Sequence, residues 1–81
     1  MSNVLIAPSV LSADFGCLAQ ELDKLLTADM IHLDVMDGHY VPNLSFGYPL
    51  IKRIRQLTNK PLDVHLMVTN PSDYIDRLAE I

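Results

Sequence analysis

The sequence predicts an α/β fold in which short parallel strands alternate with helices. Three segments rich in apolar and β-branched residues, at 4–9, 30–35 and 62–68, are predicted to be strands, and each precedes a segment with apolar residues at helical spacing. Strands separated by helices pair in parallel through right-handed crossovers. Because the strands are nearly continuous apolar runs, we expect both faces of the sheet to be buried. The predicted order over residues 1–81 is βαβαβα.

The composition indicates part of a larger fold rather than an independent small domain. The chain has 81 residues, of which 49% are hydrophobic, more than a small domain with a solvated face needs. Its formal net charge of −4 argues against nucleic acid or an anionic membrane surface as the main partner. The basic residues interpreted as a solvated helix face are Lys52, Arg53, Arg55 and Lys60.

The single cysteine and the N-terminal segment predict a soluble protein of the cytoplasm. Cys17 excludes an internal disulfide and fits a reducing compartment, and its place beside Leu18 predicts a buried, unreactive thiol. The N-terminus has no basic region and Pro8 interrupts its apolar run, so we expect no signal peptide. No run approaches the roughly 20 apolar residues of a membrane span.

The first strand and helix are predicted within residues 4–26. Residues 4–9 form a short apolar run predicted to be a buried strand, and Pro8 marks where its pairing ends. Residues 12–14, with the sequence Ser-Ala-Asp, offer a helix start. The apolar face that follows has leucines at i, i+4, i+7 and i+8, namely Leu18, Leu22, Leu25 and Leu26.

The second and third βα units follow the same pattern. The strand at 30–35 leads into a polar loop in which Asp37-Gly38 predicts a turn, and Pro49 suits the first turn of the next helix. After the third strand, Asn70 and Pro71 are predicted to be the N-cap and first residue of the last helix. The apolar helix faces consist of Leu50, Ile51, Ile54 and Leu57, and of Tyr74, Ile75, Leu78 and Ile81.

Ionisable side chains interrupt the second and third strands. Alternation puts His32 and Asp34 on one face of the strand at 30–35, and His65 on the corresponding face of the next strand. Such groups are costly in apolar strands unless they are paired or bind a metal ion. Imidazole and carboxylate together are a ligand set for Zn²⁺, Fe²⁺, Mn²⁺ or Co²⁺. We therefore expect one divalent metal ion, bound by His32, Asp34 and His65.

Other residues near the strand ends are candidates for different roles. Asp63 shares the face of the third-strand histidine but lies at the N-terminal end of the strand, so we interpret it as structural. Met36 and Met67 follow the candidate ligands by two residues, and spacing alone favours packing for both. Ser9 ends the first strand, at the edge where parallel sheets collect their ligands.

Three segments closely resemble the ribulose-phosphate 3-epimerase family: APSVLSADF at 7–15, HLDVMDGHYVPN at 32–43 and LDVHLM at 62–67. The resemblance runs in order from about Ile6 to the last residue. Members of this family are TIM-type (β/α)8 barrels, and such barrels take eight βα units. The resemblance implies that residues 1–81 are the N-terminal βαβαβα portion, the first three units, of a single TIM-barrel domain.

The resemblance also implies roles for individual residues. Asp34 would be the catalytic base, and the metal ligands would be His32, Asp34 and His65. The residues that would contact or line the substrate are Ser9, His65, Met36 and Met67. The family's second catalytic Asp and its glycine-rich phosphate loops have no counterpart in this sequence, and the join at 26–29 lacks the family's usual Gly.

The implied activity is a metal-dependent isomerisation of a phosphorylated ketopentose. D-Ribulose 5-phosphate and D-xylulose 5-phosphate would interconvert by proton abstraction at C3 through an enediolate, which the metal ion would stabilise. One alternative is an allulose-6-phosphate 3-epimerase of the same superfamily, although residues 11–15 favour the pentose enzyme. Another is a non-catalytic truncated fragment. Because three βα units leave an open sheet edge and an uncovered barrel interior, we expect the 81-residue chain alone to be inactive and to self-associate as a homo-oligomer.

Overall fold

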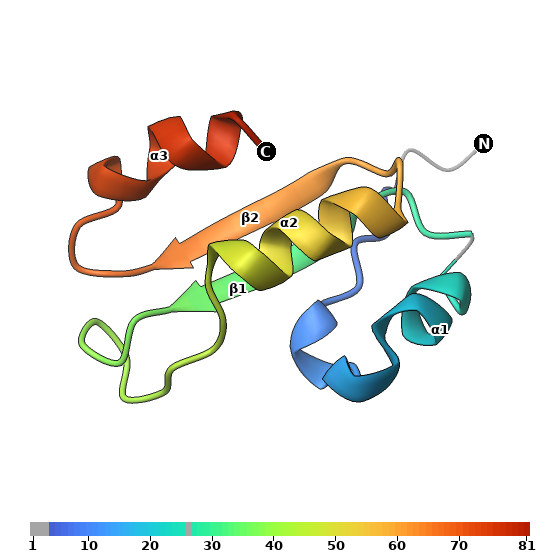
Figure 1. Cartoon of the computed structure of the whole chain (residues 1–81), viewed down its shortest axis with the longest axis horizontal. Coiled ribbons are helices and arrows are strands. Elements are labelled where there is room, and N and C mark those ends of the chain that lie inside the picture. Colours follow the sequence, from blue (N-terminus) through green and yellow to red (C-terminus); the bar gives the residue numbers. More distant parts are fainter. Residues whose placement is uncertain (1–3, 26) are drawn as a thin grey trace.

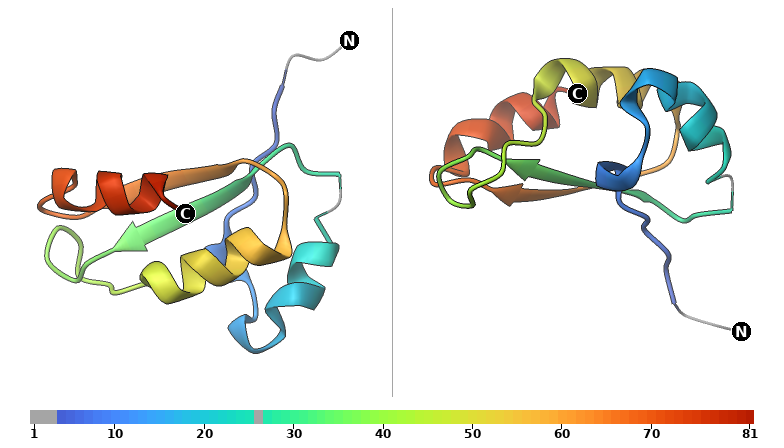
Figure 2. Two further views of the ribbon diagram at one scale, coloured as in Figure 1. Left: turned by 45° about the horizontal axis from the view of Figure 1, so that its top comes forward. Right: turned by 90° about the horizontal axis from the view of Figure 1, so that it is seen from below.

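The computed structural model describes residues 4–25 and 27–81, and its sheet consists of two parallel strands, β1 (Ile31–Met36) and β2 (Leu62–Met67). Two single-turn 3-10 helices, η1 (Val10–Ser12) and η2 (Phe15–Cys17), precede three α-helices, α1 (Leu18–Asp23), α2 (Tyr48–Leu57) and α3 (Ser72–Ala79). The three α-helices lie on one side of the sheet (Figure 1 and Figure 2). The predicted α/β class and the parallel pairing of the second and third strands are therefore confirmed.

The hydrophobic core lies between β1 and the helices. Along β1 every second residue, Ile31, Leu33 and Val35, is buried, and the residues between them are only half-buried. This alternation is the one predicted from the sequence. The buried apolar residues form one cluster of Val10, Leu18, Leu22, Ile31, Leu33, Val35, Ile51, Ile54 and Val68.

Burial of both sheet faces does not hold within the described residues, where one face is open, as expected when three βα units leave the barrel interior uncovered. The side chains of Asp63 and His65 on β2 are exposed, and those of His32 and Asp34 on the matching face of β1 are half-buried. All three α-helices lie on the opposite side (Figure 2). The polar face of the sheet is therefore accessible, and it carries the predicted site.

Residues 4–9 run beside β1 but do not form the buried strand that their sequence predicted. The carbonyl of Pro8 accepts a hydrogen bond from His32 N at 2.9 Å, and Ser9 forms an isolated parallel bridge with His32. Because β1 lies between this segment and β2, the segment lies along one edge of the described sheet and β2 forms the other. Its apolar side chains are exposed, at 73% for Val4, 65% for Leu5 and 60% for Ile6.

The first α-helix begins later than predicted. Asp14 caps η2 by accepting a hydrogen bond from Gly16 N at 2.9 Å, so the chain completes a 3-10 turn before α1 starts at Leu18. Cys17 lies at this junction and is exposed, so the prediction of a buried thiol is wrong. The predicted leucine face is confirmed in part, with Leu18 and Leu22 buried and Leu25 partly buried, whereas Leu26 lies outside the described residues.

The basic residues near α2 have two different roles. Lys52 and Arg53 are exposed, as expected of a solvated helix face. Arg55 instead donates hydrogen bonds to carbonyl groups just beyond the helix, and Lys60 Nζ donates one to the carbonyl of Ala28 at 2.8 Å. The solvated-face interpretation is therefore wrong for Arg55 and Lys60, because both side chains hold loops in place.

The starts of α2 and α3 follow the sequence with one correction. Pro49 lies in the first turn of α2, as predicted. The N-cap residue of α3 is Pro71 rather than Asn70, whose side chain donates to the carboxylate of Asp73. Ile75, expected on the apolar face of α3, is 55% exposed. Within residues 4–25 and 27–81, no helix has the length and hydrophobicity of a membrane span.

Candidate functional site

The three predicted metal ligands lie on the face of the sheet that the helices leave open. β1 and β2 pair in parallel with His32 opposite Asp63 and Asp34 opposite His65. Register partners in adjacent strands point to the same side of a sheet. The strand pairing therefore brings together the histidine and carboxylate groups that alternation had placed on one face of each strand.

The ligand atoms of these residues converge on a small volume. His32 Nε2 lies 2.9 Å from Asp34 Oδ1, and His65 Nδ1 lies 3.6 Å from the same oxygen. One ligand atom from each of the three residues lies within 4.8 Å of the other two. Tetrahedral coordination with bonds of about 2.0–2.1 Å separates ligand atoms by roughly 3.3 Å. The spacing and the nitrogen and oxygen donors thus fit a divalent metal ion.

Ser9 holds the second carboxylate oxygen of Asp34. Its Oγ donates a hydrogen bond to Asp34 Oδ2 at 2.8 Å and accepts one from Leu11 N at 3.2 Å. The second contact makes Ser9 the N-cap residue of η1, which fixes its position. The two oxygens of Asp34 therefore have different surroundings, because Oδ1 faces the histidines and Oδ2 faces Ser9.

The pKa values of Asp34 and His32 move in opposite directions. Burial acts to raise the pKa of Asp34, but hydrogen bonds from Ser9 and His32 outweigh it, so the pKa lies below its ordinary value. The pKa of His32 is raised, chiefly by its hydrogen bond to Asp63, against the opposing effect of desolvation and with a further contribution from Asp34. Asp34 is therefore ionised at neutral pH, the form that a metal ligand or general base requires.

Asp63 contacts the site in a way that the sequence analysis missed. Its Oδ2 lies 2.9 Å from His32 Nδ1, so the two ring nitrogens of His32 face two different carboxylates. The sequence predicts a structural role for Asp63, because it lies at the N-terminal end of its strand. The sequence does contain a sign of this contact. One strand has the order His-x-Asp and the next has Asp-x-His, so parallel pairing in register places a carboxylate opposite each histidine.

The two methionines end their strands side by side. Met36 and Met67 are register partners, each two residues beyond a candidate ligand, and both are partly buried. Ser45, which the sequence analysis did not single out, ties the following loop to this end of β1. Its Oγ accepts a hydrogen bond from Met36 N at 2.8 Å and donates one to the carbonyl of Asp34 at 2.7 Å. A substrate-lining role for the methionines stays a prediction.

Asp37 connects the loops that follow β1 and β2. Its Oδ1 accepts hydrogen bonds from the backbone N–H groups of His39 and Tyr40, at 2.8 and 2.9 Å. Its Oδ2 accepts one from Thr69 N at 3.0 Å. Burial acts to raise the pKa of Asp37, but these backbone donors outweigh it and lower the pKa to about 2. With Gly38 at a φ of 77°, the predicted turn is confirmed and Asp37 shapes the loop.

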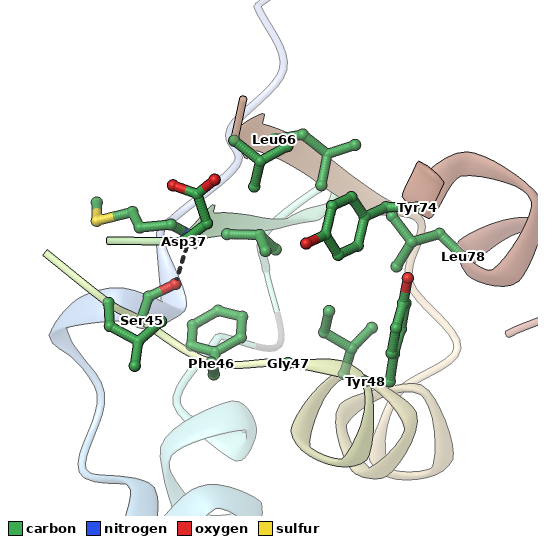
Figure 3. Close-up of a pocket in the computed structure, with 13 residues that line it drawn as sticks. Asp37, Ser45, Phe46, Gly47, Tyr48, Leu66, Tyr74 and Leu78 are labelled. Carbon is green, nitrogen blue, oxygen red and sulfur yellow. Dashed lines mark hydrogen bonds between the residues drawn. The ribbon is translucent and has the colours of Figure 1, made fainter. Parts of the chain in front are cut away.

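A separate apolar cavity of about 330 Å³ lies on the helix side of the sheet (Figure 3). Leu66 of β2, Tyr48 of α2 and Tyr74 of α3 line it, together with Ser45 of the loop after β1. None of the three candidate metal ligands lines this cavity. The candidate chemistry therefore belongs to the open face of the sheet and not to the space between the sheet and the helices.

Comparison with known proteins assigns the chain to a family. The profile of the ribulose-phosphate 3 epimerase family matches residues 5–81. The chain is 57% identical over 77 residues to the ribulose-phosphate 3-epimerase, cytoplasmic isoform, of rice (Oryza sativa subsp. japonica), covering 93% of this chain and 34% of the rice protein. It is 50% identical over 76 residues to the ribulose-phosphate 3-epimerase of Helicobacter pylori, covering 94% of this chain and 35% of that protein.

A third relative gives the same result. The chain is 48% identical over 80 residues to the ribulose-phosphate 3-epimerase of Synechocystis, covering 96% of this chain and 35% of that protein. The chain thus spans about a third of the length of the curated relatives it matches. The family match includes all three segments on which the resemblance was based, at 7–15, 32–43 and 62–67. The chain belongs to the ribulose-phosphate 3 epimerase family.

Proposed function

We propose that this chain forms part of a TIM-type (β/α)8 barrel that interconverts D-ribulose 5-phosphate and D-xylulose 5-phosphate. In such barrels the strands line the inside and the helices form the outer layer. The one-sided helix layer and the polar residues on the other face of β1 and β2 support this fold. In the proposal, residues 1–81 supply the first three βα units, and the greater length of the relatives is consistent with further units.

In the proposed site, His32, Asp34 and His65 hold one divalent ion, such as Zn²⁺, Fe²⁺, Mn²⁺ or Co²⁺. The observation that carries the proposal is the convergence of one ligand atom from each residue within 4.8 Å. When bound, the ion would supply Lewis-acid stabilisation of negative charge on the substrate oxygens. The His65 side chain is 59% exposed, which leaves the site accessible to substrate and to further ligands.

Asp34 is the proposed general base that removes the C3 proton. Its lowered pKa keeps it ionised, and the hydrogen bond from Ser9 holds Oδ2 in a fixed orientation. Proton removal beside the carbonyl group gives an enediolate, and the return of a proton to the opposite face inverts C3. Two faces require two groups, so we propose that the opposing acid comes from outside residues 1–81.

The proposed substrate is a phosphorylated ketopentose. The relatives in rice, Helicobacter pylori and Synechocystis are named ribulose-phosphate 3-epimerases, which supports the pentose over allulose 6-phosphate. The residues proposed to contact or line the substrate are Ser9, His65, Met36 and Met67. A cytoplasmic location is proposed on the name of the rice isoform.

The test of this function is proton exchange by an Asp34→Asn variant of the longest natural polypeptide that contains these residues. The variant keeps the shape of the side chain and removes the base, so solvent deuterium incorporation at C3 should fall by roughly 10²–10⁴-fold. Asp76→Asn, on the exposed side of α3, is the control and should label substrate at the wild-type rate. Near-normal labelling by metal-loaded Asp34→Asn would contradict the proposal, and faster turnover of allulose 6-phosphate would favour the alternative substrate.

A further inference from the structure

We propose that Asp63 is a positioning residue that determines which nitrogen of His32 faces the metal ion. The inference rests on the metal site proposed above and adds a residue that does not itself bind the ion. Asp63 lies near the N-terminal end of β2, where the sequence predicts a general structural role. Its contact with one ring nitrogen of His32 gives it a specific role in the site.

The two ring nitrogens of His32 have different partners. Nε2 lies 2.9 Å from Asp34 Oδ1 and belongs to the group of candidate ligand atoms. Nδ1 lies 2.9 Å from Asp63 Oδ2. His32 and Asp63 are register partners in adjacent strands, so the pairing of the sheet sets the distance between them. The imidazole ring is thereby held at Nδ1 with Nε2 directed toward Asp34.

The protonation of imidazole explains why this arrangement suits metal binding. A metal ion binds the unprotonated nitrogen of a neutral imidazole, so the remaining proton must lie on the other nitrogen. With the ion bound, the Asp63 carboxylate would accept a hydrogen bond from Nδ1–H and keep the proton there, so that Nε2 would give up its contact with Asp34 and offer its lone pair to the ion. A carboxylate in this position also makes the histidine a stronger ligand.

The exposure of Asp63 argues against a mainly stabilising role. Its side chain is 51% exposed, and ion pairs with that degree of solvation contribute little to the free energy of folding. Replacing Asp63 should therefore leave the fold intact. This allows the effect on metal binding to be measured separately from any effect on folding.

The experiment measures two properties of the longest natural polypeptide that contains this chain. The first is the affinity for Zn²⁺, from competition with a chromophoric chelator. The second is the NMR resonance of the hydrogen-bonded Nδ1 proton of His32 in the Zn²⁺-loaded protein. Asp63→Ala should lower the affinity by roughly 10–100-fold and abolish this resonance. Asp63→Asn, a neutral acceptor of similar size, should give an intermediate affinity.

The controls separate this inference from the metal site itself. Asp76 is exposed on α3, and Asp76→Asn should match the wild type in both measurements. Wild-type affinity and an unchanged Nδ1 resonance in Asp63→Ala would overturn the positioning role and leave the metal site standing. Failure of the wild-type protein to bind Zn²⁺ would overturn the metal site and the positioning role together. If Asp63→Ala does not fold, the test uses Asp63→Asn instead. A folded Asp63→Asn variant that binds Zn²⁺ with wild-type affinity would overturn the inference.

Discussion

Asp34 in β1 and His65 in β2 are register partners, and His65 Nδ1 lies 3.6 Å from Asp34 Oδ1. Because the His65 side chain is 59% exposed, its removal should affect the site more than the fold. We expect His65→Ala to lose more divalent-metal affinity than the roughly 10–100-fold that loss of an outer partner costs. Metal content per chain after dialysis against a chelator is the measurement.

The matched control for this prediction is His39→Ala, since His39 is an exposed histidine in the loop after β1. Its replacement should leave both metal content and activity unchanged. If His65→Ala keeps full metal and full activity, the assignment of His65 to the site is wrong.

Acid should weaken the fold through Asp37. Its pKa is lowered from 3.8 to about 2 by backbone N–H donors, so the stability it contributes is present above pH 4 and is lost as the pH falls toward 2. Asp37→Asn should be less stable than the wild type at pH 7, and the difference should shrink between pH 4 and pH 2. Urea unfolding at pH 7, 4 and 3 checks this expectation. A stability difference that does not change with pH would show that the charge of Asp37 is unimportant.

The elements that the sequence predicted well are those whose neighbours are present in the chain. The alternating residues of β1 and the buried residues of α2 belong to one hydrophobic cluster, so periodicity alone located Leu33 and Ile54 in the core. The predicted metal ligands also came together, because parallel pairing carries one face of β1 onto the same face of β2.

The predictions that failed depend on information that periodicity does not contain. Residues 4–9 have the composition of a buried strand, but of the two described strands only β1 lies beside them, and Val4, Leu5 and Ile6 stay exposed. The place of Cys17 beside Leu18 predicts a buried thiol, whereas local capping by Asp14 makes an exposed 3-10 turn there instead. The contact between Asp63 and His32 depends on strand register, which a single strand's pattern does not specify.

The contrast between Ile54 and Ile75 tests the assignment of the core. Ile54 is 0% exposed and lies in the central cluster, so Ile54→Ala should lower the free energy of unfolding by about 2–5 kcal/mol. Ile75 is 55% exposed, and Ile75→Ala should change the free energy of unfolding by less than about 0.5 kcal/mol. Denaturant unfolding of both variants at one pH provides the comparison. Equal losses of unfolding free energy in the two variants would contradict the assignment of Ile54 to the core.

Association of the 81-residue chain should depend on residues 4–9, which lie along one edge of the described sheet. Leu5 and Ile6 are 65% and 60% exposed beside β1, and apolar side chains on the edge of a sheet promote pairing with other chains. We expect the isolated chain to form larger assemblies and to lack epimerase activity, because the second catalytic acid is proposed to lie outside it. Light scattering should detect these assemblies, and Leu5→Lys with Ile6→Lys should reduce them. Leu44→Lys, at a 78% exposed loop position away from the edge, should have a smaller effect. A monodisperse, active monomer of the unaltered chain would contradict both parts of this prediction.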